Sequence, residues 1–399
     1  MDTTETFLCI GIADVGGIAR SGNFAGYDMC TIDYFGDTDV KSYSKKSLSI
    51  IEEYGEKKVD KSILLEKLLK LVRKLIANKE IDFTLLSSGL DDNFDFLFNL
   101  NELIPIMGND PNVFRKVRDK ENFFKDLKQM GLAFPRTFIV NDFYEALWAA
   151  KDIGFPIIIK PQSGFGGLGV KKINDKKVLR KFYKMELKEP YLVQEYITGI
   201  PASISILSNG MQGKILSINE QLLGVKDFGQ REEFVYCGNI IPLDIDVELK
   251  KECEEIKTKI VKRFKLNGTN GIDIIFSNLK KKTYIIEVNP RFQGTSEILE
   301  NYLNINLVNA HKKACLYREL IKCDSIPKQI YYLRALLYAK NNLLTPDLSN
   351  FDFVRDIPRP GLKIKSGKLV CSVLSDSQNR KQCFKKAKRL AKIIYKKSL

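Results

Sequence analysis

A short apolar run that ends in a lysine and a glycine-rich loop constrains this chain more than any other part of its sequence. Three isoleucines at 157–159 follow Pro156 and predict a short buried strand, at whose end Lys160 can carry its charge out of the core. The loop behind Lys160 contains Gly164, Gly166, Gly167 and Gly169. Glycines let backbone N–H groups approach an anion and adopt positive φ at little steric cost. A cation followed by such a loop suits the phosphates of a nucleotide.

The loop alone leaves several interpretations open. Its G-x-G-x-x-G spacing fits a dinucleotide fold, a kinase lid or an ordinary glycine-rich turn, and it is not a Walker A loop because no Gly-Lys-Ser/Thr follows. A kinase would also explain residues 227–229, which read Asp-Phe-Gly. The only histidine, His311, is followed by two lysines, however, so there is no His-Arg-Asp catalytic loop. The kinase interpretation is therefore rejected, and His311 is expected to be a packed helix residue, with a substrate contact as the alternative.

Composition narrows the class of protein. The 399 residues, 44% of them hydrophobic, predict two to three domains with substantial cores. No stretch approaches the roughly 18 apolar residues of a membrane span, and residues 1–6 lack the basic start of a signal peptide. The eight cysteines are widely spaced without a C-x-x-C motif, and one histidine makes a zinc site improbable. We expect a cytoplasmic protein with reduced thiols and no membrane contact.

A formal net charge of +15 raises the question of nucleic acid. The strongest basic run, 380–397, contains no acidic residue, and Phe384, Ala387, Ala391 and Ile394 recur in it at helical spacing. We interpret the run as an amphipathic helix packed on its domain, with a solvated basic face. A basic RNA-binding protein is the distant alternative, and it would bind with a steep salt dependence.

The first hundred residues predict a Rossmann-like domain. Strands are expected at 7–12, 29–33 and 81–87, with Asp60 capping an amphipathic helix between the last two. The glycines after the first strand lack the dinucleotide spacing, so no NAD site is expected.

The middle of the chain mixes helices and strands. Asp110 and Pro111 predict a helix start, and charged helical sequence runs to about 131. A strand at 137–140 and a helix to about 151 precede the glycine loop. Further predictions are a strand at 191–197, a hairpin at Asn209-Gly210 and a helix over 248–264.

Two apolar runs, 268–276 and 284–291, predict an antiparallel pair of strands. Glu287 and Asn289 share one strand face, Ile286 and Val288 are expected to point into the core, and Asp273 can lie opposite on the facing strand. Two carboxylates and an amide oxygen suit Mg²⁺. The alternative is a half-exposed hairpin with incidental polar residues.

Together these motifs resemble the ATP-grasp superfamily, which includes biotin carboxylase and D-alanine–D-alanine ligase. The resemblance is closest to a branch of predicted ATP-dependent carboligases related to biotin carboxylase. It implies an α/β and α+β protein: a Rossmann-like pre-ATP-grasp domain at 1–110, a two-subdomain ATP-grasp fold at 111–315 and a small C-terminal extension at 316–399. The matching motifs are Lys120, Lys160 with 162–169, 193–197, Asp273 and 287–291.

The resemblance also implies site residues. The implied phosphate-binding residues are Lys120 and Lys160, with Ser163, Gly164, Gly166, Gly167 and Gly169 in the loop that closes over the triphosphate. The implied adenine contacts are Gln194, Glu195 and Ile197, and the implied Mg²⁺ ligands (Mn²⁺ being an alternative ion) are Asp273, Glu287 and Asn289. Arg291, facing an acyl phosphate, and Lys160 are the implied catalytic residues.

The function implied is that of an ADP-forming ligase that activates a small-molecule carboxylate as an acyl phosphate and joins it to an amine or another nucleophile. A carboxylating enzyme related to biotin carboxylase is the alternative, although the chain lacks a biotin-accepting lysine domain. Residues 200–203 stand where many members place a glutamate for the ribose, so the ribose contacts are not assigned. A homodimer is an expectation, and nucleic acid is an unlikely partner.

Overall fold

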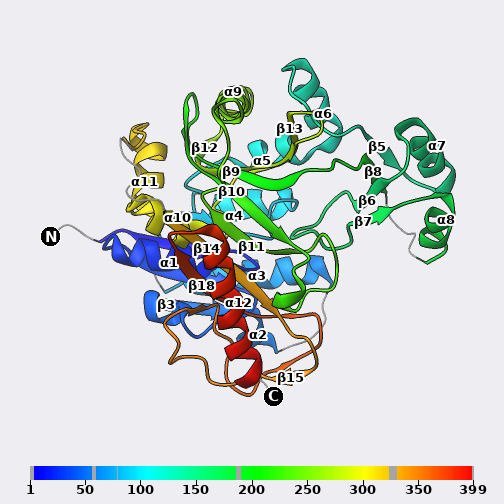
Figure 1. Cartoon of the computed structure of the whole chain (residues 1–399). Coiled ribbons are helices and arrows are strands. Elements are labelled where there is room, and N and C mark those ends of the chain that lie inside the picture. Colours follow the sequence, from blue (N-terminus) through cyan, green and yellow to red (C-terminus); the bar gives the residue numbers. More distant parts are fainter. Residues whose placement is uncertain (1–3, 56–59, 79, 186–189, 323–329, 398–399) are drawn as a thin grey trace.

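The computed structural model describes residues 4–55, 60–78, 80–185, 190–322 and 330–397 (Figure 1). Its N-terminal part is a parallel sheet with the strand order β3-β2-β1-β4. Phe7 and Cys9 of β1 pack in a core with α1, whereas Leu8 and Ile10 pack in a second core with α3 and α4. A strand buried on both faces explains why this segment is apolar throughout, and the predicted Rossmann-like architecture is confirmed. The elements are β1 (Thr6–Ile10), α1 (Val15–Phe24), β2 (Asp28–Asp33), the 3₁₀ turn η1 (Val40–Tyr43), β3 (Lys46–Ser49), α2 (Ile50–Tyr54), α3 (Lys61–Ile76), β4 (Phe83–Leu86) and α4 (Phe94–Leu103).

Two short helices follow where one helical run was predicted. The Asp110 side chain accepts a hydrogen bond from the backbone N–H of Asn112, as expected of an N-cap. The helix then ends and restarts at Asp119, whose side chain caps a second helix. Asp60, in contrast, occupies the N-cap of α3 without a side-chain capping bond. The two helices are α5 (Pro111–Arg118) and α6 (Lys120–Gln129).

The next segment forms an antiparallel four-stranded sheet with the order β5-β8-β6-β7. In Figure 1 this sheet and its two helices project to the right of the main body. Strand β6 contains the isoleucines at 157–159, which are buried as predicted. The elements are β5 (Thr137–Val140), α7 (Phe143–Ile153), β6 (Ile157–Pro161), β7 (Lys171–Ile173), α8 (Lys176–Met185) and β8 (Tyr191–Glu195).

The centre of the molecule is an eight-stranded antiparallel sheet with the order β13-β12-β9-β10-β11-β14-β18-β16. The hairpin predicted at Asn209-Gly210 joins β9 and β10, and the Asn209 side chain accepts backbone hydrogen bonds within the turn. The elements are β9 (Ile200–Asn209), β10 (Gly213–Leu223), η2 (Lys226–Phe228), β11 (Tyr236–Ile241), α9 (Val247–Phe264), β12 (Asn267–Ser277), β13 (Lys282–Asn289), α10 (Ser296–Leu303), α11 (Leu307–Lys312) and the π-helical turn η3 (Lys313–Tyr317).

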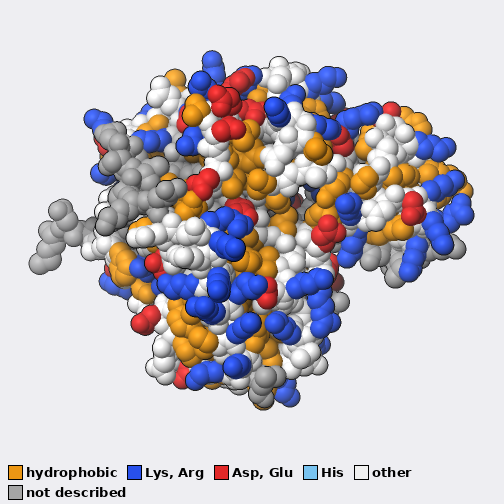
Figure 2. All heavy atoms as spheres, in the orientation of Figure 1, with side chains coloured by type: hydrophobic (Ala, Val, Ile, Leu, Met, Phe, Trp, Pro, Cys, Tyr) orange, Lys and Arg blue, Asp and Glu red, His pale blue; other side chains and the backbone are white. Residues whose placement is uncertain are grey.

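The C-terminal part continues this same sheet. Strand β14 pairs with β11 and then with β18, so residues after 330 are hydrogen-bonded into the central sheet. The terminal helix packs on the sheet with Ala387, Ala391 and Ile394 buried as predicted, whereas the predicted Phe384 is only half-buried and Cys383 takes the buried position beside it. Figure 2 shows many lysines and arginines over the lower half of this face, where α12 runs in Figure 1. The elements are β14 (Tyr331–Tyr338), β15 (Leu343–Leu344), β16 (Val354–Arg355), β17 (Lys363–Ile364), β18 (Leu369–Ser377) and α12 (Arg380–Lys397).

Two further expectations can be compared with the structure. Seven cysteines are described, and six of them are buried; Cys323 lies outside the described residues. Among the described residues, no helix is both long and apolar enough to cross a membrane.

Candidate active site

The two strands predicted to carry a metal site are neighbours. Asp273 of β12 pairs directly with Glu287 of β13, so their side chains lie on the same face of the sheet. The amide nitrogen of Asn289 donates to Asp273 Oδ2 at 3.0 Å, and Gln221 donates to Oδ1 at 2.9 Å. Burial and the neighbouring Glu287 raise the pKa of Asp273 to about 7. The three predicted metal ligands are therefore brought together.

One detail of the hairpin differs from the prediction. The register shifts between Asp273 and Ile274, which leaves Ile286 without a partner on β12. This bulge changes the alternation of the strand, so Ile285 and Val288 lie in the core and Ile286 is only half-buried. The expectation that Ile286 packs in the core was wrong, because strict alternation was assumed across the bulge.

Three cations surround Glu287. Arg118 Nη1 lies 3.3 Å and Lys120 Nζ 3.4 Å from Glu287 Oε2. Burial opposes ionisation of Glu287, but the positive charges of Arg118, Lys120 and Lys160 prevail and lower its pKa to about 2. Burial and nearby Lys120 lower the pKa of Lys160 to about 8. In the described part of the chain Lys160 has no ion-pair partner, so the cluster holds more positive charge than Glu287 neutralises.

The glycine loop is hydrogen-bonded on one side to the N-terminal domain and on the other side to β11 of the central sheet. The N–H of Gly164 donates to Asp92 Oδ2 at 3.1 Å, and the carbonyl of Gly166 accepts from the N–H of Tyr236 at 2.9 Å. Gly167 has φ of +74°, and a Cβ there would overlap the carbonyl group of Phe234. Glycine at this position is therefore required for the close backbone approach. Ser163 and Gly164 are exposed at the start of the loop.

The residues predicted to line adenine lie on and just beyond β8, next to the strand that carries Lys160. Gln194 is buried and donates to Thr137 Oγ1 at 2.8 Å. Glu195 accepts from Lys280 Nζ at 2.6 Å and from the N–H of Arg136 at 3.2 Å, and Ile197 is buried. None of the hydrogen bonds or ion pairs recorded for the described residues joins these side chains to the cations around Glu287.

Arg291, the predicted catalytic arginine, is held by a residue that the sequence did not indicate. Its Nε lies 2.8 and 3.0 Å from the two carboxylate oxygens of Asp91. The adjacent Asp92 binds Arg118 through Nε at 2.5 Å and Nη2 at 3.0 Å. Both aspartates follow β4, whose carboxyl end is where ligands approach a parallel sheet. Their position after this strand was the one feature of the sequence that could have indicated Asp91 and Asp92 as site residues.

The structure supports the interpretation of His311 as a packed helix residue over that of a substrate contact. Its Nδ1 accepts the N–H of Thr269 at 2.9 Å, and its Nε2 lies 3.0 Å from the carbonyl oxygen of Met107. Burial lowers the pKa of the imidazole to about 4, with the bond to Met107 opposing it. His311 is a buried, neutral residue that links two backbone segments, and it has no ring nitrogen free for a substrate.

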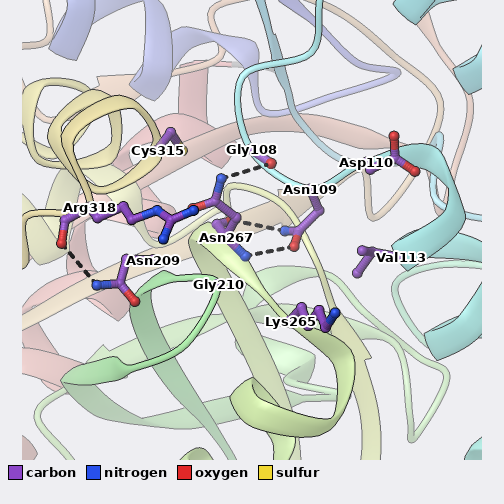
Figure 3. Close-up of a pocket in the computed structure, with 10 residues that line it drawn as sticks. All are labelled: Gly108, Asn109, Asp110, Val113, Asn209, Gly210, Lys265, Asn267, Cys315 and Arg318. Carbon is purple, nitrogen blue, oxygen red and sulfur yellow. Dashed lines mark hydrogen bonds between the residues drawn. The ribbon is translucent and has the colours of Figure 1, made fainter.

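The structure also contains a cavity of about 350 Å³ (Figure 3). Figure 3 shows hydrogen bonds between Asn109 and Asn267, and Lys265 and Arg318 are also among the lining residues. None of the predicted site residues lines it. The electrostatic convergence on Glu287 identifies the active-site candidate better than cavity size does.

The donor set fits a magnesium ion. Asp273, Glu287 and Asn289 offer hard oxygen atoms on one sheet face, and water or phosphate would complete an octahedral shell. Among the described residues, no group of three or more histidine, cysteine, aspartate or glutamate side chains is arranged to hold a metal. An ion here would therefore depend on further ligands such as phosphate.

Comparisons with known proteins agree with this geometry. Residues 117–295 match the family described as the ATP-grasp domain. An uncharacterised protein of Methanocaldococcus jannaschii is 27% identical over 362 residues, which cover 88% of this chain and 83% of the relative. Two solved structures share the fold at low sequence identity. The biotin carboxylase domain of Hydrogenobacter thermophilus 2-oxoglutarate carboxylase, solved as a dimer with MgADP and bicarbonate, has a TM-score of 0.73 at 16% identity and covers 94% of this chain and 86% of that one. The Bacillus licheniformis L-amino acid ligase has a TM-score of 0.70 at 15% identity, with 99% and 98% covered.

Proposed function

We propose that this chain, whose residues 117–295 match the ATP-grasp domain family, is an ATP-dependent ligase that joins a small-molecule carboxylate to an amine. The observation that carries the proposal is the convergence of Arg118, Lys120 and Lys160 on Glu287. Asp92 pairs with Arg118 and Glu287 pairs with Lys120, which leaves Lys160 without an ion-pair partner among the described residues; a bound triphosphate would neutralise this remaining charge.

Each group of site residues has its own role in the proposed reaction. Lys120 and Lys160 bind the phosphates, the loop 163–169 covers them and excludes water, and residues 194–197 lie along adenine. Arg291 is held beside the reacting groups by Asp91 and orients the acyl phosphate. The residues that would hold Mg²⁺, or Mn²⁺, are Asp273, Glu287 and Asn289; a bound ion would neutralise charge on the phosphates.

The bonds change in two steps. An oxygen of the substrate carboxylate attacks the γ-phosphorus in line, a new O–P bond forms, and the bond to the bridging oxygen of ADP breaks. The amine nitrogen then attacks the acyl carbon, and the bond from that carbon to the phosphate oxygen breaks. The amine loses one proton and phosphate leaves, so the products are the amide, ADP and phosphate.

Carboxylation is the second candidate, because bicarbonate can take the place of the organic carboxylate in the first step. The biotin carboxylase domain among the structural neighbours, which was solved with bicarbonate, favours keeping it. A homodimer is likewise proposed, by analogy with that neighbour.

An ADP-release screen over pooled carboxylates and amines tests the proposal, with bicarbonate in separate reactions. We expect ADP release that needs Mg²⁺ and one particular carboxylate–amine pair. Glu287→Gln preserves the shape of the side chain and should reduce turnover about 10²- to 10³-fold while the fold is kept. ADP release that depends on bicarbonate alone would select the carboxylating alternative, and the absence of release with all pools would reject both.

A further inference from the structure

The cavity in Figure 3 is separate from the predicted nucleotide and metal contacts, none of which line it. Its walls are the start of α5, the turn between β9 and β10, the segment from the end of α9 to β12, and η3 with the residue that follows it. Its volume of about 350 Å³ lies within the range of small-molecule sites in proteins.

Two cations in these walls have no partner for their charge. Lys265 is the C-cap residue of α9, and Arg318 is the C-cap residue of η3. Within the residues that the structure describes, neither side chain makes a hydrogen bond, an ion pair or a cation–π contact. Figure 3 shows the Arg318 side chain extending toward Asn267. The cavity therefore offers the N–H donors of a guanidinium and of an ammonium group to an anion.

The backbone at both cations is unusual. Lys265 has φ of +53° and Arg318 has φ of +59°, values at which glycine is the usual residue because it has no Cβ. Each cation is therefore held at a backbone cost that glycine would avoid. Backbone outliers of this kind are a reason to look for a binding role.

The remaining lining groups decide which anion fits. Asp110 is the one acidic residue in the lining, and its carboxylate caps α5, where the helix N-terminus balances its charge. Val113 and Cys315 supply less polar surface, and burial raises the pKa of the Cys315 thiol to about 12, so the thiol is uncharged. A phosphate monoester carries about 1.5 to 2 negative charges at neutral pH, which matches the two unpaired cations better than one carboxylate does.

Asn109 connects this cavity to the candidate active site. Its Oδ1 accepts from the N–H of Asn267 at 2.8 Å in the cavity wall. Its Nδ2 donates to the carbonyl oxygen of Pro290 at 2.9 Å, and the next residue is the proposed catalytic Arg291. One side chain thus joins the cavity wall to the segment that carries this arginine.

Helix α5 makes a second connection. Val113, in its first turn, lines the cavity, whereas its last residue, Arg118, contacts Glu287. The helix has eight residues and is therefore about 12 Å long. A ligand that contacts the start of α5 would bear on the position of the cation at its end.

We propose that this cavity is a regulatory site for a small organic phosphate. Its phosphate group binds Lys265 and Arg318, and its organic part lies against Val113 and Cys315. The bound molecule holds the start of α5 and the Asn109 junction in place, so that ATP binds more tightly. The binding site stands on the cavity itself, whereas its effect on ATP rests on the nucleotide site proposed above.

Calorimetry on the full chain tests the site, with the nucleotide site filled by a saturating non-hydrolysable ATP analogue and Mg²⁺. The probes are a panel of sugar phosphates, phosphorylated hydroxy acids and nucleoside monophosphates, each paired with its dephosphorylated parent, together with inorganic phosphate. We expect at least one ester to bind about tenfold or more tightly than its parent and than inorganic phosphate, because the parent loses the charge-assisted hydrogen bonds and inorganic phosphate loses the organic contacts.

Variants then locate the contact. Lys265→Gln and Arg318→Gln should each weaken binding of that ester about tenfold or more, and without the ester both should keep the affinity for the ATP analogue. The matched control is Lys262→Gln, an exposed position one turn earlier on α9, and it should change neither affinity. Melting curves verify that each variant is folded.

The regulatory role is measured as a coupling between the two ligands. The saturating ester should increase the affinity for the ATP analogue about fivefold or more, and by linkage the analogue should increase the affinity for the ester by the same factor. Both couplings should be absent in Arg318→Gln. Ester binding that leaves the affinity for the analogue unchanged would reject the regulatory role.

The site itself is overturned if no ester in the panel binds, if the parent compounds or inorganic phosphate bind equally well, or if Lys262→Gln weakens binding as much as Lys265→Gln does. These outcomes are distinct from failure of the ligase function, because a non-hydrolysable analogue reports binding alone. Ester binding without ADP release in any pool would retain the site and reject the ligase, and ADP release without ester binding would do the reverse.

Discussion

The carboxylate of Asp92 accepts a hydrogen bond from the backbone N–H of Gly164, 72 residues further along the chain, with Oδ2 and N 3.1 Å apart. The same carboxylate binds the guanidinium of Arg118, which in turn contacts Glu287. A protein anion therefore already occupies one amide of the glycine loop. This contact ties the loop to the N-terminal domain.

Replacing Asp92 tests that tie. Asp92→Asn removes the charge that neutralises buried Arg118, so the free energy of unfolding should fall by about 2 kcal/mol. Amide hydrogen exchange over residues 164–169 should become faster, because the amide that replaces the carboxylate has only one acceptor oxygen for both Gly164 and Arg118. Asp95→Asn, on the exposed first turn of α4, is the control and should change neither quantity. Unchanged exchange in Asp92→Asn would show that the contact does not order the loop.

Two glycines of the loop form a matched pair. Both Gly166 and Gly167 have positive φ, +62° and +74°, so alanine at either position carries a backbone cost of about 1–2 kcal/mol. Only at Gly167 would the new Cβ also overlap Phe234. We expect Gly167→Ala to raise the KM for ATP about tenfold above that of Gly166→Ala, with similar melting temperatures. Equal KM values would mean that docking on Phe234 is irrelevant to nucleotide binding.

The lowered pKa of Lys160, about 8 compared with an ordinary 10.5, predicts a pH dependence. Between these values the unfolded chain holds the proton and the folded chain releases it, so this lysine makes unfolding less favourable as pH rises through that window. ATP binding requires the protonated ammonium, so affinity should fall above pH about 8. Calorimetry across this range should show weaker binding for Lys160→Ala at neutral pH and a smaller slope above it. A variant with wild-type affinity would refute the assignment of Lys160 to the phosphates.

Removing the terminal helix distinguishes packing from nucleic-acid binding. A chain that ends before Arg380 loses four buried side chains of α12 and should melt at a markedly lower temperature. The matched variant replaces the exposed Lys381, Lys385, Lys392 and Lys396 by glutamine and should keep the melting temperature. Loss of salt-sensitive RNA binding in that variant, with stability retained, would instead support a nucleic-acid surface.

Local sequence patterns predicted most of the architecture. The alternation around Glu287 and Asn289 was enough to place them on one face opposite Asp273, because strand geometry repeats every two residues. The same reasoning failed at Ile286, since a bulge is an insertion relative to a partner strand and leaves no mark in the residues themselves. Similarly, a helical period through residues 111–131 gave no sign of the break at Asp119.

The contacts that complete the candidate site were outside the reach of such patterns. Arg118 contacts Asp92 and Glu287, which are 26 and 169 residues away in the sequence. Arg291 contacts Asp91, which is 200 residues away. Arg334 joins Asp14 to Asp356 in the same way. These pairs depend on how three parts of the chain pack together, and no spacing within one segment encodes that packing.

The unbroken central sheet limits how this chain can be dissected. Because β14 pairs with β11, a fragment ending at residue 315 would expose the unpaired edge of β11 to other molecules. Such a fragment would also lack Arg334, whose guanidinium forms an ion pair with Asp14 at the start of α1. In evolution or engineering, therefore, the last 80 or so residues can be exchanged only for a segment that supplies both a strand to pair with β11 and a cation to pair with Asp14.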